Sequence, residues 1–322
     1  MRALVRTVSG TLWAEVPEPQ LQPDGVLIHV ALVGLCRTDL AVAAGDLPVT
    51  LPRILGHEFV GRVIDVGPEV QTIAVGDKVV ADPVIRCGRC ERCLGGWHHA
   101  CKEAKFLGVD IDGAIAQWIA VPECNLWRFP IDTDDRVAAL LEPVAACAAV
   151  VSPSIHPDQR GVIYGSSRLS RLTHMILRSY GFRNLQCVAA DSGVFACDQF
   201  EFAIDTEGTT ESFERLCESL RPRGELILKS RPLQPISFDV RHRLPKEPTI
   251  RFVNYSDFSE ARRLLLETEI DFQSLLGPVW MPDDFARALE SAAVDQYRKH
   301  YIQPTAVDDC QQGSATEMQC VP

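Results

Sequence analysis

The sequence predicts an α/β protein of two domains, a mainly-β front domain and a smaller domain with a doubly wound parallel sheet. The length of 322 residues fits about two domains. Residues 1–33 alternate apolar and polar positions in short runs between prolines and glycines, which is typical of antiparallel strands. Residues 161–191 follow a strand–turn–helix–strand order, which is typical of a βαβ unit.

Composition narrows the class of protein. Hydrophobic residues make up 46% of the chain and charged residues 23%, as in ordinary globular proteins. The net charge of −11, without a long basic run, argues against nucleic acid or an anionic membrane as a partner. The longest apolar stretch, 137–151, is interrupted by Glu142-Pro143 and falls short of the roughly 18 residues of a membrane span. The start lacks a signal-peptide core, and the 12 cysteines do not require a disulfide scaffold in a chain this long, so we expect a cytoplasmic protein.

The predicted elements follow in order along the chain. Strands are expected over 2–7, 11–16, 26–33, 61–66, 75–80, 114–121 and 125–129, and one helix over 132–149 with Asp132 as its capping residue. The second half is expected to hold strands over 161–165, 186–190, 200–205, 225–229 and 275–279, and helices over 172–180, 210–220, 259–269 and 282–292. Residues 305–322 are polar and aperiodic, which predicts a disordered tail.

A candidate metal centre lies in the front domain. Cys36 and the pair His57-Glu58 supply a thiol, an imidazole and a carboxylate, the ligand types of a catalytic zinc with one open position. A lone cysteine is more often a buried core thiol, but the polar pair Thr38-Asp39 favours a ligand here. We expect Asp39 to accept the second ring N–H of His57 and Thr38 to place its hydroxyl beside the metal. The alternative for either residue is a helix cap.

A second candidate centre is a cluster of cysteines with the spacing C-x2-C-x2-C-x7-C. Its members are Cys87, Cys90, Cys93 and Cys101. Four thiolates in one short lobe suit a closed, tetrahedral zinc site that is structural rather than catalytic. Two disulfides are the alternative, although neighbouring C-x2-C pairs close small rings poorly. His98 and His99 lie inside the lobe, and with four thiolates present we expect both at the surface.

The loop after the strand 161–165 is the candidate cofactor site. It consists of Gly165, Ser166, Ser167, Arg168, Leu169 and Ser170. Dinucleotide-binding loops follow G-x-G-x-x-G, and only the first glycine is present. Ser167 and Ser170 are small, and their hydroxyls or Arg168 are candidates for phosphate contacts. Asp191 ends the next strand, where an acid holds the ribose hydroxyls of NAD and disfavours the 2′-phosphate of NADP.

These motifs carry a family resemblance. The supporting segments are 34–39, 56–58, 87–101, 75–79, 106–110, 121–122 and 141–143. The chain resembles the zinc-dependent medium-chain dehydrogenases/reductases, the alcohol dehydrogenase superfamily, and is most similar to the threonine and polyol dehydrogenase branch. The resemblance is strong over 25–150, weaker over 160–230 and faint after that.

The resemblance implies a particular fold and site. Residues 1–145 together with 272–304 would form a GroES-like catalytic domain, and residues 146–271 a truncated Rossmann-like domain. The catalytic zinc would be held by Cys36, His57 and a carboxylate, either Glu58 or Glu142. Glu142 lies in an apolar stretch, where a carboxylate is costly unless it is paired or metal-bound. Its alternative is to face the domain cleft without touching metal.

The sequence departs from this family at three places. Ala41 stands where many relatives have a histidine, which affects the outer end of a proton relay through Thr38. The glycine loop has lost two of its three glycines. Only residues 192–199 separate Asp191 from the next strand, where relatives place a helix, a strand and a further helix. The segment 203–208 still resembles the strand and turn beside the nicotinamide, which adds Thr206 to the expected cofactor contacts.

The resemblance predicts an oxidoreductase that transfers a hydride between a small polar secondary alcohol, of amino alcohol or polyol type, and NAD(H). NADP(H) is the less favoured cofactor, and two Zn²⁺ per chain are expected. The partners would be a small-molecule alcohol or ketone and further copies of the chain in a homodimer or homotetramer. The alternative is a zinc-stabilised, cofactor-deficient binding or scaffold protein, which the damaged glycine loop and the shortened sheet favour.

Overall fold

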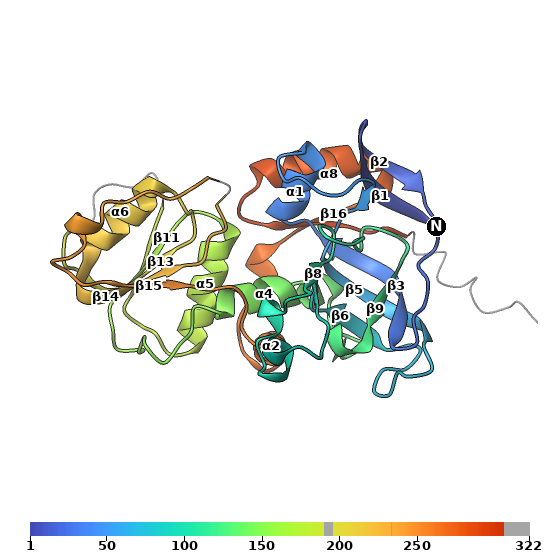
Figure 1. Cartoon of the computed structure of the whole chain (residues 1–322), viewed down its shortest axis with the longest axis horizontal. Coiled ribbons are helices and arrows are strands. Elements are labelled where there is room, and N and C mark those ends of the chain that lie inside the picture. Colours follow the sequence, from blue (N-terminus) through green and yellow to red (C-terminus); the bar gives the residue numbers. More distant parts are fainter. Residues whose placement is uncertain (190–195, 233, 306–322) are drawn as a thin grey trace, which may run out of the picture. The chain divides into compact units, whose positions relative to one another are not determined.

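The computed structural model describes residues 1–189, 196–232 and 234–305 and divides the chain into two compact units (Figure 1). The first unit comprises Met1–Ala139, Gly277–Val294 and Lys299–Pro322, and the second comprises Leu140–Leu276 and Asp295–Arg298. The predicted ribose-binding residue Asp191 and the predicted tail beyond residue 305 lie outside the described residues. Among the described residues, no helix has both the length and the apolar character needed to cross a membrane.

The first unit is built mainly from strands. One sheet has the order β2-β1-β4, with β1 (Arg2–Thr7), β2 (Gly10–Glu15) and β4 (Arg53–Ile54). The largest sheet has the order β10-β6-β5-β3-β17-β16, with β9 also paired to β3; its strands are β3 (Gly25–Gly34), β5 (Glu58–Val66), β6 (Lys78–Ala81), β9 (Trp118–Pro122), β10 (Leu126–Phe129), β16 (Leu276–Trp280) and β17 (Lys299–Ile302). A two-stranded sheet joins β7 (Val84–Ile85) to β8 (Lys105–Phe106). The helices are α1 (Arg37–Ala44), α2 (Glu91–Leu94), α3 (Asp135–Ala138) and α8 (Phe285–Val294), with short 3₁₀ turns at His98–Ala100, Glu123–Asn125 and Pro282–Asp284.

The register of the central strand β3 creates the first candidate site. Alternate residues Val26, Ile28 and Val30 are fully buried, so the side-chain period of two fixes which face of β3 packs on the core. β3 runs antiparallel to β5, and Gly34 at the end of β3 pairs with Glu58 at the start of β5. The chain leaving β3 and the chain entering β5 therefore meet at one edge of the sheet.

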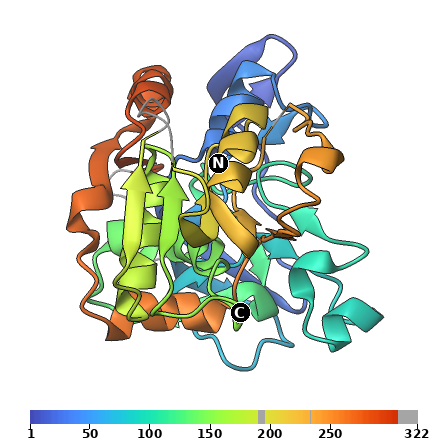
Figure 2. The same cartoon turned by 90° about the vertical axis from the view of Figure 1, so that its left-hand side faces the viewer.

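The second unit is a five-stranded parallel sheet with the order β12-β11-β13-β14-β15 (Figure 2). Its strands are β11 (Gly161–Tyr164), β12 (Leu185–Val188), β13 (Phe200–Asp205), β14 (Leu220–Leu228) and β15 (Thr249–Phe252). Its helices are α4 (Leu141–Ala148), α5 (Arg168–Ser179), α6 (Thr210–Ser219) and α7 (Phe258–Glu267), with 3₁₀ turns at Val240–His242 and Phe272–Leu275.

Both faces of the parallel sheet are covered. Val162 of β11 packs in a cluster with Phe213 and Leu216 of α6. The next residue, Ile163, points to the opposite face and packs with Leu177 of α5. A parallel sheet covered on both faces is the doubly wound arrangement, which confirms the predicted α/β fold class.

The helix predicted over 132–149 is wrong as a single element. The structure has two helices there, α3 and α4, and Asp134 rather than Asp132 caps the first by accepting the Arg136 N–H at 2.8 Å. Pro143 supplies the physical reason, because it has no N–H to donate to the carbonyl one turn earlier and is tolerated only in the first turn of a helix. The helix therefore ends and restarts at Leu141, which places Pro143 in the first turn of α4.

Candidate metal centres and nucleotide loop

The structure brings together three of the predicted zinc ligands. Ligand atoms of Cys36, His57 and Glu58 all lie within 4.8 Å of one another. Cys36 follows β3, while His57 and Glu58 lie at the start of β5, so the paired ends of these strands place them side by side. His57 and Glu58 are almost fully buried, and Cys36 is half-buried.

Asp39 organises this cluster from the first turn of α1. Its carboxylate accepts the backbone N–H groups of Cys36 and Gly56, each at 2.9 Å, and Oδ1 lies 3.4 Å from His57 Nδ1. Asp39 thus caps the helix and orients the imidazole at the same time. Burial raises the pKa of Asp39, but the neighbouring His57 and the donated hydrogen bonds outweigh it and hold this pKa below the usual 3.8. Burial lowers the pKa of His57, and the Asp39 carboxylate reverses this and leaves it well above 6.5.

Thr38 lies next to the cysteine. The Cys36 thiol donates to Thr38 Oγ1 at 3.7 Å, and the hydroxyl is half-buried. The structure therefore places this hydroxyl at the cluster, and its role beside a metal stays a prediction.

Lys299, which the sequence did not mark as a site residue, completes the cluster. Lys299 is fully buried in β17, and its Nζ forms an ion pair with Glu58 Oε2. A Cβ on Gly34 would lie 2.6 Å from Lys299 Cε and 3.0 Å from Glu58 Oε2, so the absence of a side chain at Gly34 makes room for the pair. In the sequence Lys299 stands in a polar segment, 295–304, which we did not assign to a strand, so no local pattern marks this lysine.

The donor set fits zinc. A thiol, an imidazole whose other nitrogen faces a carboxylate, and a buried carboxylate are the ligands and supporting groups of catalytic zinc sites. Bond lengths of about 2.0–2.3 Å place ligand atoms of one tetrahedral ion roughly 3.3–3.8 Å apart, within the 4.8 Å spread of this cluster.

Glu142 lies in the second unit, in the first turn of α4, and is nearly buried there. Tyr255 donates its hydroxyl to Glu142 Oε1 at 2.5 Å. Burial and the adjacent Glu142 raise the pKa of Tyr255 well above 10. The carboxylate is therefore paired by a neutral donor within its own unit, and its predicted bond to zinc stays a prediction.

The cysteine lobe has the dimensions of a tetrahedral thiolate site. Sγ–Sγ distances are 3.5 Å for Cys90–Cys93 and for Cys87–Cys101, and 3.9 Å for Cys90–Cys101. Four sulfurs bound to one zinc at about 2.3 Å would lie about 3.8 Å apart. The cysteines of the described residues are free thiols, so the disulfide alternative is wrong. Both His98 and His99 are exposed.

Backbone amides favour the thiolate form of two of these sulfurs, those of Cys90 and Cys101. Cys101 Sγ accepts the N–H groups of Cys87 and Glu103, each at 3.4 Å, which lowers the pKa of Cys101. The backbone N–H groups of Lys102 and Cys93 lower the pKa of Cys90 to about 6. Because zinc binds the thiolate, these hydrogen bonds favour the metal-bound state.

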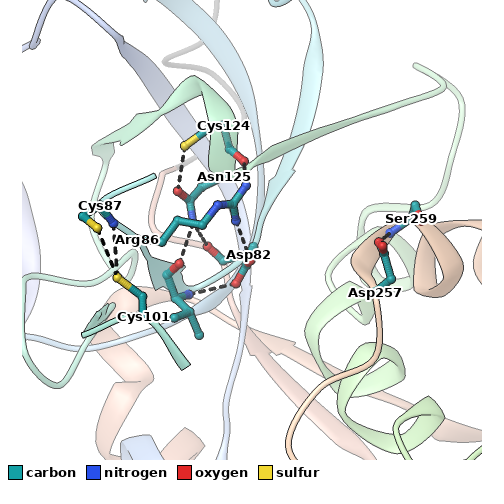
Figure 3. A network of polar contacts seen from close by, with 9 residues as sticks. Asp82, Arg86, Cys87, Cys101, Cys124, Asn125, Asp257 and Ser259 are labelled. Carbon is teal, nitrogen blue, oxygen red and sulfur yellow. Dashed lines mark hydrogen bonds and ion pairs between the residues drawn. The ribbon is translucent and has the colours of Figure 1, made fainter. Parts of the chain in front are cut away.

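A polar network anchors the entry to the lobe (Figure 3). Arg86, the residue before Cys87, pairs with Asp82 at 3.2 Å and donates to the Cys124 carbonyl at 2.6 Å. Buried Asn125 donates to the carbonyls of Asp82 and Val84. This network fixes the point at which the lobe leaves the sheet β7-β8.

The predicted nucleotide loop keeps its setting between β11 and α5. Gly165 has φ +135°, and a Cβ there would lie 2.1 Å from Thr206 Oγ1, so this glycine is required. The Thr206 hydroxyl donates to the Tyr164 carbonyl at 2.8 Å, and the Leu169 carbonyl accepts from the Cys147 thiol. The Ser167 hydroxyl is buried without a hydrogen-bond partner among the described residues.

Two amides of this loop are used within the chain. The Ser166 N–H donates to Glu207 Oε1 at 3.2 Å, and the Arg168 N–H donates to the Gln296 carbonyl at 2.7 Å. A diphosphate on a loop of this kind accepts backbone N–H groups at the helix N-terminus. In this conformation the loop therefore does not fit a dinucleotide without displacement of those acceptors.

Comparisons with known proteins agree with the geometry. Residues 22–131 match the alcohol dehydrogenase GroES-like domain. L-threonine 3-dehydrogenase of Streptomyces coelicolor is 28% identical over 95% of this chain and 100% of its own length, and sorbitol dehydrogenase of Halalkalibacterium halodurans is 34% identical over 56% of this chain and 54% of its own. The crystal structure of an alcohol dehydrogenase from Escherichia coli CFT073, complexed with NADH, has a TM-score of 0.85 at 20% identity, covering 94% of this chain and 99% of that one.

Residues 22–131 thus form a GroES-like domain of the alcohol dehydrogenase type. The relatives support an alcohol dehydrogenase-like oxidoreductase, and the solved structure shows that the fold is shared over 94% of the chain.

Proposed function

We propose that this protein is a zinc-dependent oxidoreductase that transfers a hydride between a small polar secondary alcohol and NAD(H). The observation that carries the proposal is the cluster of half-buried Cys36 with buried His57 and Glu58, whose ligand atoms lie within 4.8 Å of one another. The cysteine lobe supports a second, structural zinc at a separate place in the same unit.

Zinc held by Cys36 and His57, with Glu58 or Glu142 as carboxylate, would act as a Lewis acid on the substrate oxygen. The residues of the chain have separate tasks in this proposal. Asp39 fixes the ring orientation of His57 through its 3.4 Å contact with Nδ1. Thr38, beside the Cys36 thiol, would take the alcohol proton and pass it outward. Lys299 balances the charge of Glu58.

The substrate class rests on the relatives. Both the threonine and the sorbitol dehydrogenases are named for a small polar secondary alcohol, an amino alcohol in one case and a polyol in the other. NAD(H) is the proposed hydride carrier, and NADP(H) the less favoured one. A cytoplasmic location and a homodimer or homotetramer belong to the same proposal, and light scattering of the purified protein measures the assembly.

The test combines metal content with turnover. We expect about two zinc ions per chain in the parent protein, and about one in Cys36→Ser and His57→Ala, each with loss of oxidation of threonine-like and sorbitol-like alcohols. Cys124→Ser changes an exposed thiol in the same unit and serves as the matched control. Unchanged zinc content and turnover in Cys36→Ser would rule out the proposed site.

A second candidate function is a zinc-stabilised binding or scaffold protein. The observation that favours it is the use of the Ser166 and Arg168 amides by acceptors of the chain itself. This candidate predicts about two zinc ions per chain, no alcohol oxidation and no saturable NADH binding in the parent protein.

A further inference from the structure

The turn after β13 lies at the topological switch point of the parallel sheet. β11 is flanked by β12 on one side and by β13 on the other, so the chain reverses its winding between β11 and β13. Ligands of doubly wound sheets bind outside the carboxyl ends of the strands at this point. Tyr164, the last residue of β11, pairs with Asp205, the last residue of β13, so the residues that follow both strands face the same place.

Glu207 fills that place with a negative charge. Its Oε1 accepts the N–H of Ser166 at 3.2 Å, and a Cβ built on Gly165 would lie 2.7 Å from the same oxygen. The half-buried carboxylate therefore rests on the glycine turn itself. Asp205 Oδ1 accepts the backbone N–H groups of Glu207 and Gly208, at 2.9 and 3.0 Å, which fixes the turn that carries Glu207.

The first N–H of α5 also has a partner within the unit. The first helical N–H, of Arg168, donates to the Gln296 carbonyl at 2.7 Å, and the Arg168 guanidinium donates to the Arg298 carbonyl at 2.8 Å. Asp295 accepts the N–H groups of Tyr297 and Arg298 and so holds this acceptor turn together. The Ser166 and Arg168 N–H groups thus already donate to oxygen atoms of the chain. A bound diphosphate would have to displace those oxygen atoms.

We propose that Glu207 is an internal competitor for the diphosphate of the dinucleotide and sets the affinity of this chain for its cofactor. The inference rests on the proposed function, because it presumes a dinucleotide at the switch point. A carboxylate and a diphosphate would compete for the same N–H of Ser166, and two anions at one turn repel each other. The dinucleotide binds only when the Glu207 side chain turns away from the loop, and part of its binding energy is spent on that displacement.

The test is a fluorescence titration of the full-length protein with NADH. Glu207→Gln removes the charge at constant size and is expected to tighten NADH binding about tenfold or more, the scale of one like charge beside a partly buried anion site. Glu207→Ser is a second neutral variant with the same expectation, should the first one not fold. Glu269→Gln, an exposed acid of the same unit, is the matched control and should leave the dissociation constant unchanged.

A probe without phosphate separates the competition from a general change in the site. Reduced nicotinamide riboside should bind the parent and Glu207→Gln equally, and a similar gain for this probe would overturn the inference. Equal NADH affinity in parent and variants would also overturn it, while leaving the proposed function intact. Absence of saturable NADH binding in the parent and in both neutral variants would overturn the inference and the NAD(H) part of the proposed function together.

Discussion

Lys299 and Glu58 form a charged pair in a place where charge is costly. Both side chains are buried, and neither is exposed by more than 2%. Ions removed from water are tolerated when they are paired, and removing one partner leaves the other uncompensated. This pair ties β17, close to the end of the described chain, to the start of β5 beside His57.

We expect Lys299→Met to destabilise the protein by about 3–5 kcal/mol, because the Glu58 carboxylate stays buried without its counter-charge. Urea unfolding of the zinc-free protein measures the change, because zinc bound to Glu58 would itself supply a counter-charge. Arg89→Met removes one partner of an ion pair that is largely exposed and serves as control, with an expected cost of about 0–1 kcal/mol. An equal and small effect of both variants would show that Glu58 does not depend on Lys299.

Tyr255 and Glu142 form a buried polar pair in the second unit. The carboxylate is nearly buried, and the Tyr255 hydroxyl donates to it. Tyr255→Phe removes only that hydroxyl, and we expect a loss of about 1.5–3 kcal/mol, the range for a hydrogen bond to a charged group. Tyr297→Phe, at an exposed tyrosine, is the control. If Glu142 also binds zinc, Tyr255→Phe should alter the visible spectrum of the cobalt-substituted protein, which a purely structural role would not do.

At the scale of the element, Glu123 anchors a loop to a 3₁₀ turn. Its carboxylate accepts the backbone N–H groups of Gln71, Thr72 and Ile73 and the Thr72 hydroxyl. Burial raises the pKa of Glu123, but the hydrogen bonds from Thr72 and its neighbours outweigh it and hold this pKa below the usual 4.5. One carboxylate thus fixes the segment that connects β5 to β6.

We expect Glu123→Gln to cost about 1–3 kcal/mol of stability at neutral pH, since an amide oxygen is a weaker acceptor for several N–H groups than a carboxylate. The pKa is lower in the folded than in the unfolded chain, so this stabilisation is fully present above about pH 4.5 and is lost as the pH falls through the folded pKa. Unfolding of parent and variant at a series of pH values checks this. A difference between them that stays constant down to acid pH would contradict it.

The sequence predicted most elements, and the errors have physical causes. Alternating burial made strand β3 readable, because side chains of period two report directly on the core. The apolar stretch 137–151 hid the break between α3 and α4, which depends on the missing N–H of Pro143 and not on hydrophobicity. Strand β17 has only four residues and is buried throughout, so no alternation marks it.

Some residues of the candidate sites could be predicted from the sequence, and others could not. Cys36, His57 and the four lobe cysteines could be named from ligand type and spacing, which are local properties of the sequence. Lys299 and Glu207 could not, because their roles depend on strand pairing and on the turn after β13. In the sequence each is an ordinary charged residue, and the long-range contact that gives it meaning appears only in the fold.

At the scale of the whole molecule, the two units have separate hydrophobic cores. One cluster includes Val26, Phe59 and Ile115 of the first unit, and others include Val162, Phe213 and Phe202 of the second. The clusters of possible metal ligands found among the described residues both lie in the first unit. Metal held by these two clusters should therefore stabilise the first unit directly.

Calorimetric unfolding tests this division of stability. Two units with separate cores should give two transitions rather than one. Removal of zinc by a chelator, or Cys101→Ser in the lobe, should lower only the transition of the first unit, because folding energy from metal binding resides where the ligands are. A loss of about 3 kcal/mol corresponds to a drop of about 6–12 °C for a unit of this size. Cys124→Ser should shift neither transition, and an equal shift of both transitions on zinc removal would show that the units unfold as one body.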